Sequence, residues 1–523
     1  MKRPHLLWLL CAIAALSAVM VLPEISGTDE TVRIRVANSL VTRGEVSIPF
    51  WASDDKYTNV YVNEERGLTY GLWNIGQSLV LAPFLALSNP LKESVADPVG
   101  KTLVQGAVVS IGYALFVNVL LALATYGVLR QMRLSRRSSA LGVLVLALCT
   151  QWLVWGMSMQ EESLCALLLM AALWCGLRAR TSAQPWRWGI AMGCLFGYLA
   201  NVRFNGAFAA GAVLLWCAWM IPDRKRALMF AASVVLAALP WAALWLWYNW
   251  ERTGDAFLSP YAANFAIMRR DLGMDTSWHF SYVRWAWMLV GLDNGAIWFA
   301  LPLLFLPALR NRKPRPGGPG FQWLTVFMVV ALLLHAVLLS GFYAGVGVQG
   351  AGSPRYLGHQ LILFGPLVWV ALRRLWLKRT RLARAGIAFV LVASCVLQLS
   401  ARLLNPELEA SQDLNAEHAG VPHPKPEMHL PRRFNNIGLA LHGRLEKQTY
   451  PGFAQIDPVT KSRHTMLVIT PAYIMFLDKH FQPAPKDPRG AFYWGWFGGA
   501  LTFVACATML WRSTRRCAAR RVG

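Results

Sequence analysis

The sequence predicts an all-α, polytopic membrane protein, and three observations lead to this fold class. Of the 523 residues, 55% are hydrophobic and only 15% are charged. The chain contains 24 tryptophans, and its mean hydropathy is +0.38, a balance that a soluble protein of this length would have difficulty burying. The apolar residues also fall in runs long enough to cross a bilayer. We expect about twelve transmembrane helices, with an amphipathic helix in the first external loop.

The spans follow from apolar runs of roughly 17–25 residues. The first run has a short basic start like a signal peptide, but no convincing A-x-A cleavage site follows it, so we expect it to be retained. In chain order the predicted spans are residues 6–22, 104–128, 139–157, 162–177, 188–202, 206–221, 227–248, 294–309, 321–342, 357–372, 385–401 and 493–511.

The basic residues define the orientation. The net charge of +24 does not indicate a nucleic-acid partner, because the basic residues form short clusters between apolar runs rather than one polar face. With alternating spans, the clusters fall on the same side as the amino terminus, and the positive-inside rule makes that side cytoplasmic. We therefore expect a multi-pass protein of a cytoplasmic (inner) membrane with both termini in the cytoplasm. The clusters are residues 130–138, 178–187, 223–226, 310–318, 373–384 and 512–521.

The opposite side receives three long segments, about 23–103, 249–293 and 402–492, where we expect the function to lie. The predicted organisation is a transmembrane catalytic body over 1–401, whose first external loop is 23–103, then an extracytoplasmic segment over 402–492. A last transmembrane helix and basic cytoplasmic tail occupy 493–523. The nine cysteines all lie in predicted spans or in the tail, which indicates that no disulfide framework holds the external segments.

The first external loop begins with a predicted helix. Thr28 or Asp29 can cap it, and Gly44 stands at its stop position. Asp29 and Glu30 then lie at the amino-terminal end, where the helix dipole favours their ionised forms. On this evidence alone, acidic residues at a helix start are ordinary capping. Apolar residues at helical spacing give the helix one hydrophobic face, and they are Val32, Val36, Ala37, Leu40 and Val41.

Five motifs in order resemble a known family. They are DETVRIRVANSLVTRGEVSIP from residue 29, NEERGLTYGLWNIGQSLVLAPF (63–84), SMQEESLCALLL (158–169), LANVRFNG (199–206) and GAGSPRYLGHQL (350–361). Together they resemble the membrane glycosyltransferases of the GT-C fold, in the branch of bacterial aminoarabinose transferases and protein O-mannosyltransferases (glycosyltransferase family 39-like). The fourth motif departs from the family's "RPN" turn, with Phe204 where proline is usual. The resemblance covers roughly residues 25 to 370.

The resemblance implies a glycosyltransferase that moves a sugar from a polyprenyl-phosphate donor to a glycan, lipid or protein acceptor. It makes Asp29 the general base or acceptor-orienting residue, with Glu30 in support. Glu161 and Glu162 would bind the sugar or a metal, and Mg²⁺ or Mn²⁺ suits such carboxylates. Metal dependence varies across the fold and stays open, and inversion at the anomeric carbon is the expectation.

Arg203 and Arg355 support the same site on physical grounds. Each lies at the predicted outer end of a span, where cytoplasmic anchoring cannot explain it. A guanidinium at that depth pairs with a phosphate or a carboxylate, because leaving it unpaired near hydrocarbon is expensive. We predict that both bind phosphate. The alternative is a structural pair with a carboxylate such as Glu161 or Glu162, or snorkelling to lipid headgroups.

Weaker candidates complete the predicted site. Tyr70 and Tyr356, in two of the motifs, are candidate substrate contacts. Asp54 and Asp55 form a pair that resembles a sugar or metal site, but an ordinary solvated loop is the better explanation for them. His335 lies inside a predicted span, where an ionisable residue is a functional hypothesis. Near mid-span, however, such a histidine is more often a hydrogen-bonded packing residue.

Two other functions compete with the enzyme. A flippase or other transporter of lipid-linked glycans would line a continuous path to the cytoplasmic face with charges, whereas this sequence gathers them at the outer ends of spans. A non-catalytic subunit of an envelope-assembly complex would not bring Asp29 together with the outer arginines. No internal repeat of fixed period is evident, which weakens the transporter interpretation.

Overall fold

The computed structural model describes most of the predicted body and little of the segment after it. The described residues are 4–21, 28–50, 60–96, 98–156, 158–273, 277–291, 295–309, 320–342, 355–378, 380–403, 433–438 and 489–519. Asp54, Asp55 and nearly all of 402–492 lie outside these ranges, and Arg355 is described in its backbone only.

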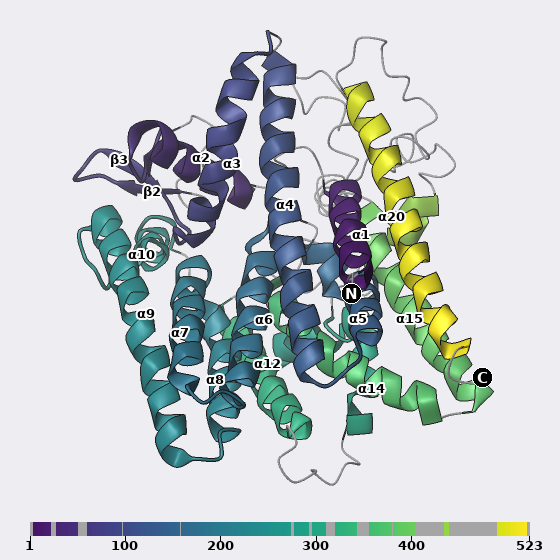
Figure 1. The fold of residues 1–523 in the computed structure, drawn as a ribbon. Coiled ribbons are helices and arrows are strands. Elements are labelled where there is room, and N and C mark those ends of the chain that lie inside the picture. Colours follow the sequence, from purple (N-terminus) through teal and green to yellow (C-terminus); the bar gives the residue numbers. More distant parts are fainter. Residues whose placement is uncertain are drawn as a thin grey trace.

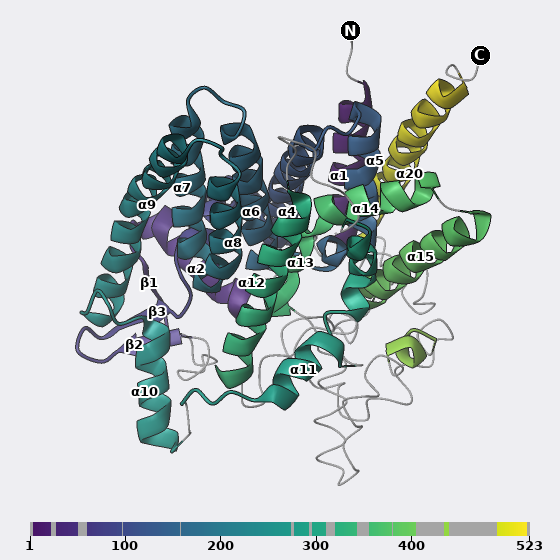
Figure 2. The same cartoon turned by 90° about the horizontal axis from the view of Figure 1, so that it is seen from below.

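A bundle of helices forms the body of the molecule (Figures 1 and 2). Five of the described helices are long and apolar enough to cross a membrane, which agrees with a multi-pass membrane protein. They are α4 (Pro98–Gln131), α6 (Glu161–Ala179), α9 (Arg224–Thr253), α12 (Phe321–Phe342) and α15 (Arg381–Leu403).

Further helices occupy the other predicted spans. The first and last of them, α1 and α20, pack against each other although they lie at opposite ends of the chain (Figure 1). Every predicted span therefore coincides with helix in the described residues, while the number of helices that cross the bilayer stays a prediction. These further helices are α1 (Pro4–Met20), α5 (Arg136–Cys149), α7 (Pro185–Val202), α8 (Ala207–Trp219), α13 (Gly358–Leu363), α14 (Gly365–Lys378) and α20 (Arg489–Ala519).

Several spans are broken rather than continuous. The predicted span 139–157 ends in a π-helical turn, η1 (Trp152–Gly156), and the span 294–309 is the 3₁₀-type η3 (Trp298–Leu309) with a kink at Ala300. Pro302 and Pro307 lie inside η3, and proline removes a backbone donor that an α-helix needs. Irregular backbone inside a membrane is tolerated where it is covered by protein, and η1 is buried throughout.

The predicted first external loop folds into a small α/β unit that the all-α prediction did not include. Its sheet is antiparallel, in the order β1 (Ser47–Ile48), β3 (Leu68–Gly71), β2 (Val60–Asn63), with Ser47 opposite Tyr70 and Val60 opposite Gly71. Helix α2 (Thr28–Arg43) lies beside the sheet and contacts α3 (Gly76–Glu93) (Figure 1).

Helix α2 matches the predicted bounds but is buried on its polar side as well as its apolar side. Val32 and Val36 pack with strand residues Ile48 and Val60, as the apolar spacing predicts. Arg33 is also buried, with 1% of its surface exposed. An amphipathic helix at a membrane surface would keep such a charge in water. The polar face of α2 therefore meets protein.

Several hydrogen bonds dock the loop onto predicted outer ends of spans, and one at each of three span ends is described here. The Asn74 side chain donates to the Ala200 carbonyl at 3.0 Å near the end of α7. Arg252, near the end of α9, donates to the Gly71 carbonyl at 2.9 Å. The Gln77 side chain donates to the Met159 carbonyl just before α6. One loop thus reaches three span ends that the alternating topology places on one side. The rest of that side includes α10 (Pro260–Leu272) and α11 (Tyr282–Val290) (Figure 2).

Gly44 ends α2 in a left-handed conformation, with φ at +69°, and a Cβ added there would meet nothing within 4 Å. The substitution Gly44→Ala should therefore lower the free energy of unfolding by about 1 kcal/mol through backbone strain alone. Thermal unfolding in detergent measures it. Gly211→Ala is the matched control, because it also adds a methyl group in open space but lies inside α8 without a positive φ. Equal effects of the two substitutions would contradict the prediction.

Candidate active site

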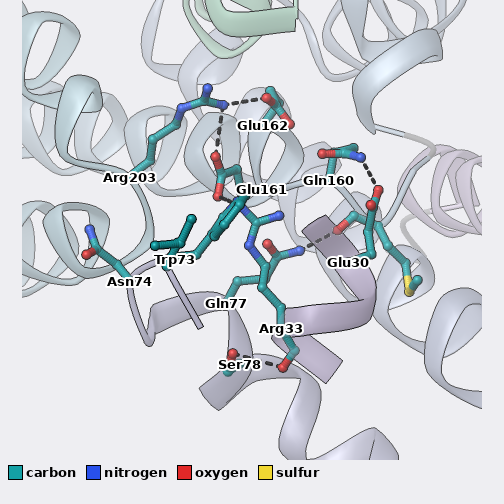
Figure 3. Close-up of polar contacts among 12 residues, drawn as sticks. Glu30, Arg33, Trp73, Asn74, Gln77, Ser78, Gln160, Glu161, Glu162 and Arg203 are labelled. Carbon is teal, nitrogen blue, oxygen red and sulfur yellow. Dashed lines mark hydrogen bonds and ion pairs between the residues drawn. The ribbon is translucent and has the colours of Figure 1, made fainter. Parts of the chain in front are cut away.

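A cluster of charged side chains lies where α2, α6 and α7 meet (Figure 3). Glu30 and Arg33 come from α2, and Glu161 and Glu162 form the first turn of α6. Arg203 follows the last residue of α7. The five side chains thus come from three places, which are the predicted first external loop and the predicted outer ends of α6 and α7. Chain segments far apart in sequence therefore supply one site.

Two arginines and two glutamates make a continuous ion-paired chain. Arg33 donates from Nη2 to Glu161 Oε2, and Arg203 donates from Nη1 to Glu162 Oε1. Arg203 Nη1 also lies 3.1 Å from Glu161 Oε1, so Glu161 bridges the two guanidinium groups. The four side chains are at most 8% exposed. Charges buried this deeply need each other, because an unpaired one would be costly.

Glu30 joins the cluster through Gln160, whose amide donates to Glu30 Oε1. The start of α2 is held in place by Ser78, which donates to the Arg33 carbonyl at 3.0 Å. Asp29 is half-buried. It precedes Arg33 by four residues, so the two lie on the same face of α2.

Local structure explains how these groups are aimed at one place. Glu161 and Glu162 follow the N-cap Gln160, so the positive end of the α6 dipole stabilises both carboxylates. Arg203 has an extended backbone with φ −155° and ψ 112°, and its N–H donates to the Leu199 carbonyl at 2.7 Å. This bend after α7 turns the Arg203 side chain toward the start of α6.

Aromatic rings cover both guanidinium groups. The Cζ atom of Arg33 lies 5.4 Å from the centre of the Trp73 ring, and that of Arg203 lies 4.7 Å from the Tyr356 ring. Cation–π contacts of this kind gain strength when they are shielded from water. Tyr356 lies in η4 (Arg355–Leu357), which therefore forms another wall of the site.

The structure brings together most of the predicted residues that it describes. Glu30, Glu161, Glu162, Arg203 and Tyr356 all belong to the cluster. Their roles in binding or catalysis stay predictions.

Tyr70 does not belong to that cluster. It is fully buried in a separate apolar group with Val46, Ile75 and Tyr248, and this burial raises the pKa of its phenol. A role in contacting substrate stays a prediction for Tyr70. Asp54, Asp55 and the Arg355 side chain lie outside what the structure describes.

Arg33 and Gln160 are central residues that the sequence interpretation did not select. A signal for Arg33 was present, since Arg33, Arg35 and Arg43 stand in a loop predicted to be external, against the positive-inside rule. Arg33 also has two guanidinium nitrogens, Nε and Nη1, that are buried without a hydrogen-bond partner among the described residues. These N–H groups are suited to an anion that the cluster does not itself supply.

The predicted divalent cation fits this arrangement poorly. Glu161 and Glu162 are already neutralised by guanidinium groups. Within the described ranges, no group of three His, Cys, Asp or Glu side chains is placed to hold a metal ion. We therefore derive no chemical step through a metal.

A known protein family matches the segment that contains most of the charged side chains of this cluster. Residues 103–248 match the dolichyl-phosphate-mannose-protein mannosyltransferase family. The matched segment contains Glu161, Glu162 and Arg203, and it confirms for this part of the chain the resemblance to GT-C glycosyltransferases. No curated protein of similar sequence matches the chain.

Several solved membrane enzymes are similar in structure. ArnT from Cupriavidus metallidurans in the apo state is 15% identical, with a TM-score of 0.44 over 81% of this chain and 73% of that one. ArnT bound to undecaprenyl phosphate is 15% identical, with a TM-score of 0.43 over 82% and 74%. The apo oligosaccharyltransferase of Archaeoglobus fulgidus is 12% identical, with a TM-score of 0.42 over 82% of this chain and 59% of its own length. The chain thus spans about three fifths of the archaeal enzyme.

Proposed function

We propose that this protein is a membrane glycosyltransferase that transfers a sugar from a polyprenyl-phosphate donor to an envelope acceptor on the extracytoplasmic face. The observation that carries the proposal is the buried meeting of Arg33 and Arg203 with Glu161 and Glu162. The family match over 103–248 supports it, since three of these four residues lie inside that segment. The solved ArnT complex with undecaprenyl phosphate is consistent with a lipid phosphate ligand.

The arginines would act on the donor phosphate. When the bond between the anomeric carbon and the phosphate oxygen breaks, negative charge grows on the lipid phosphate that leaves. Guanidinium groups fixed in a water-poor site stabilise that charge, because little reorganisation is needed as it forms. Arg33 has unused N–H groups for this purpose, and Glu161 holds both guanidinium groups in position.

The carboxylates at the start of α2 would act on the acceptor. In a single displacement, the acceptor oxygen attacks the anomeric carbon while the phosphate leaves, and the hydroxyl proton passes to a base. We assign that base to Asp29, with Glu30 orienting the acceptor, and we expect inversion at the anomeric carbon. We also propose that the protein lies in the inner membrane with both termini in the cytoplasm. The chain is then divided into a transmembrane catalytic body, an extracytoplasmic segment, and a last transmembrane helix with a cytoplasmic tail.

The test is transfer of radiolabelled sugar from a polyprenyl-phosphate donor pool in membranes that contain equal amounts of wild-type protein or Asp29→Asn. Asparagine keeps the size and the capping ability but removes the charge, so transfer should fall roughly 100- to 10,000-fold.

Asp223→Asn is the matched control, because Asp223 caps α9 through bonds from the Lys225 and Arg226 amides at the predicted cytoplasmic end. It should transfer like wild type. Equal transfer by Asp29→Asn would assign Asp29 to capping and move the base to Glu161, Glu162 or Asp54. Movement of unaltered donor across the bilayer, without transfer by wild type, would favour a flippase.

A further inference from the structure

A second polar group lies beside the arginine cluster and has no assigned role. His335 on α12 and His359 on α13 are both fully buried, and their ring centres are 5.8 Å apart. Gln360 is also buried, and its side-chain nitrogen lies 2.9 Å from His335 Nδ1. We call His335, His359 and Gln360 the histidine group.

Most of the hydrogen-bonding capacity of the histidine group is unused. His335 Nε2, both ring nitrogens of His359, and Gln360 Oε1 are buried without a partner among the described residues. Each buried polar atom left unsatisfied costs about 1–3 kcal/mol. A native protein rarely leaves four together, so a ligand or ordered water is expected there.

The unused atoms include both donors and acceptors. A neutral His359 offers one N–H donor and one acceptor nitrogen. In the His335–Gln360 bond, either the amide donates to Nδ1 or, with the amide reversed, Nδ1 donates to it. Both arrangements leave one donor and one acceptor unused on that pair. The group therefore presents at least two donors and two acceptors, whichever tautomers are present.

This inventory identifies the class of ligand. A phosphate at neutral pH mainly accepts hydrogen bonds, so it would leave both acceptors unpaired and facing negative charge. Hydroxyl groups donate and accept at once, and they satisfy all four positions. A neutral polyhydroxylated ring therefore matches the histidine group better than an anion does.

The histidine group adjoins the proposed phosphate site. Tyr356, which covers Arg203, lies three residues before His359. Phe208, which stacks on His335 with ring centres 5.5 Å apart, lies five residues after Arg203. Both imidazoles are also within electrostatic range of the Arg203 guanidinium. A donor whose phosphate contacts Arg203 would have its sugar within reach of the histidine group.

We propose that His335, His359 and Gln360 bind hydroxyl groups of the sugar that the lipid donor carries, and that they set which sugar is accepted. This inference rests on the proposed function for the identity of the ligand. It assigns to these residues sugar recognition and no part in the proton transfer.

The experiment compares the binding of lipids with and without a sugar to the purified full chain in lipid nanodiscs. The probes are undecaprenyl phosphate alone and undecaprenyl phosphate carrying a hexose, an N-acetylhexosamine or a pentose. The measured quantity is the sugar preference, which is the Kd for the bare lipid divided by the Kd for a sugar-bearing lipid. Wild type should prefer at least one sugar-bearing lipid by about tenfold or more, since each neutral hydrogen bond contributes roughly 0.5–1.5 kcal/mol.

The variant His359→Leu should lose most of that preference while its Kd for bare undecaprenyl phosphate stays within about twofold. His359→Gln keeps a donor and an acceptor, so it should retain part of the preference even if the leucine variant folds poorly. Leu361→Met is the control on the same helix, because Leu361 is buried and apolar, and it should behave like wild type.

Three results would overturn the inference. They are a retained sugar preference in His359→Leu, an equal loss of affinity for bare and sugar-bearing lipids, and the absence of any sugar preference in wild type. The first two would mean that the group holds water or only packs the helices. If wild type prefers a sugar-bearing lipid but transfers no sugar, the proposed function is wrong and the inference that these residues bind sugar is retained.

Discussion

Replacing Arg203 with methionine is expected to reduce sugar transfer by at least about 100-fold and to destabilise the protein by about 3–5 kcal/mol. Transfer falls because the leaving phosphate loses a fixed cation. Stability falls because Glu162, whose side chain is 0% exposed, loses its Arg203 partner inside the protein. Transfer assays at equal protein levels and thermal unfolding in detergent measure the two effects separately.

A second substitution separates folding from function in this prediction. Arg203→Met combined with Glu162→Gln removes the uncompensated charge, so it should recover part of the lost stability but none of the transfer. Arg66→Met is the control for arginine removal, because Arg66 pairs with Glu251 at 3.4 Å in a partly exposed part of the first external loop. It should transfer within about twofold of wild type. If Arg203→Met kept more than a tenth of the transfer, the phosphate role of Arg203 would be wrong.

Replacing Arg33 with methionine is expected to weaken the binding of bare undecaprenyl phosphate by roughly 10- to 150-fold. This range corresponds to one hydrogen bond to a charged group, about 1.5–3 kcal/mol. The reason is that Arg33 holds Glu161 through Nη2 while Nε and Nη1 are unused in the described structure. Lipid-binding measurements on purified, folded protein give the affinity directly.

The substitution Arg33→Lys tests whether the charge of Arg33 alone is sufficient for lipid binding. Arg33→Lys keeps the charge, but a point charge cannot contact Glu161 and a phosphate with the planar fork of a guanidinium. We therefore expect it to recover little of the affinity, although it should keep more stability than Arg33→Met. Unchanged lipid affinity in a folded Arg33→Met would show that Arg33 serves only to neutralise Glu161.

The two arginines illustrate how differently the sequence reports on residues of one site. Arg203 could be selected from the sequence, because a cation at the predicted outer end of an apolar span contradicts the positive-inside rule and therefore needs a partner. Arg33 carried the same signal more weakly. It stands in a helix whose acidic first turn is already explained by capping, so the charges of this helix did not call for a further partner. Its partner Glu161 lies 128 residues away, and no local pattern reports a pairing at that distance.

For the fold too, some elements could be predicted from the sequence and others could not. Hydropathy and periodicity predicted where the helices lie, and Gly44 predicted where α2 ends, because both depend on residues close together in the chain. The sheet β1–β3–β2 was missed, since strands of two to four residues leave almost no periodic signal.

By itself, the sequence determined a membrane-embedded helical protein, because the length of apolar runs is a local property. It also predicted acidic and basic residues at the outer ends of the spans, because charge placement is local as well. Only the tertiary structure decided which of these charges meet. It placed Glu161 between Arg33 and Arg203, sent Tyr70 into a separate apolar group, and brought His335 beside His359. Such contacts depend on how helices pack across long sequence separations, and a single sequence does not encode that packing in any short pattern.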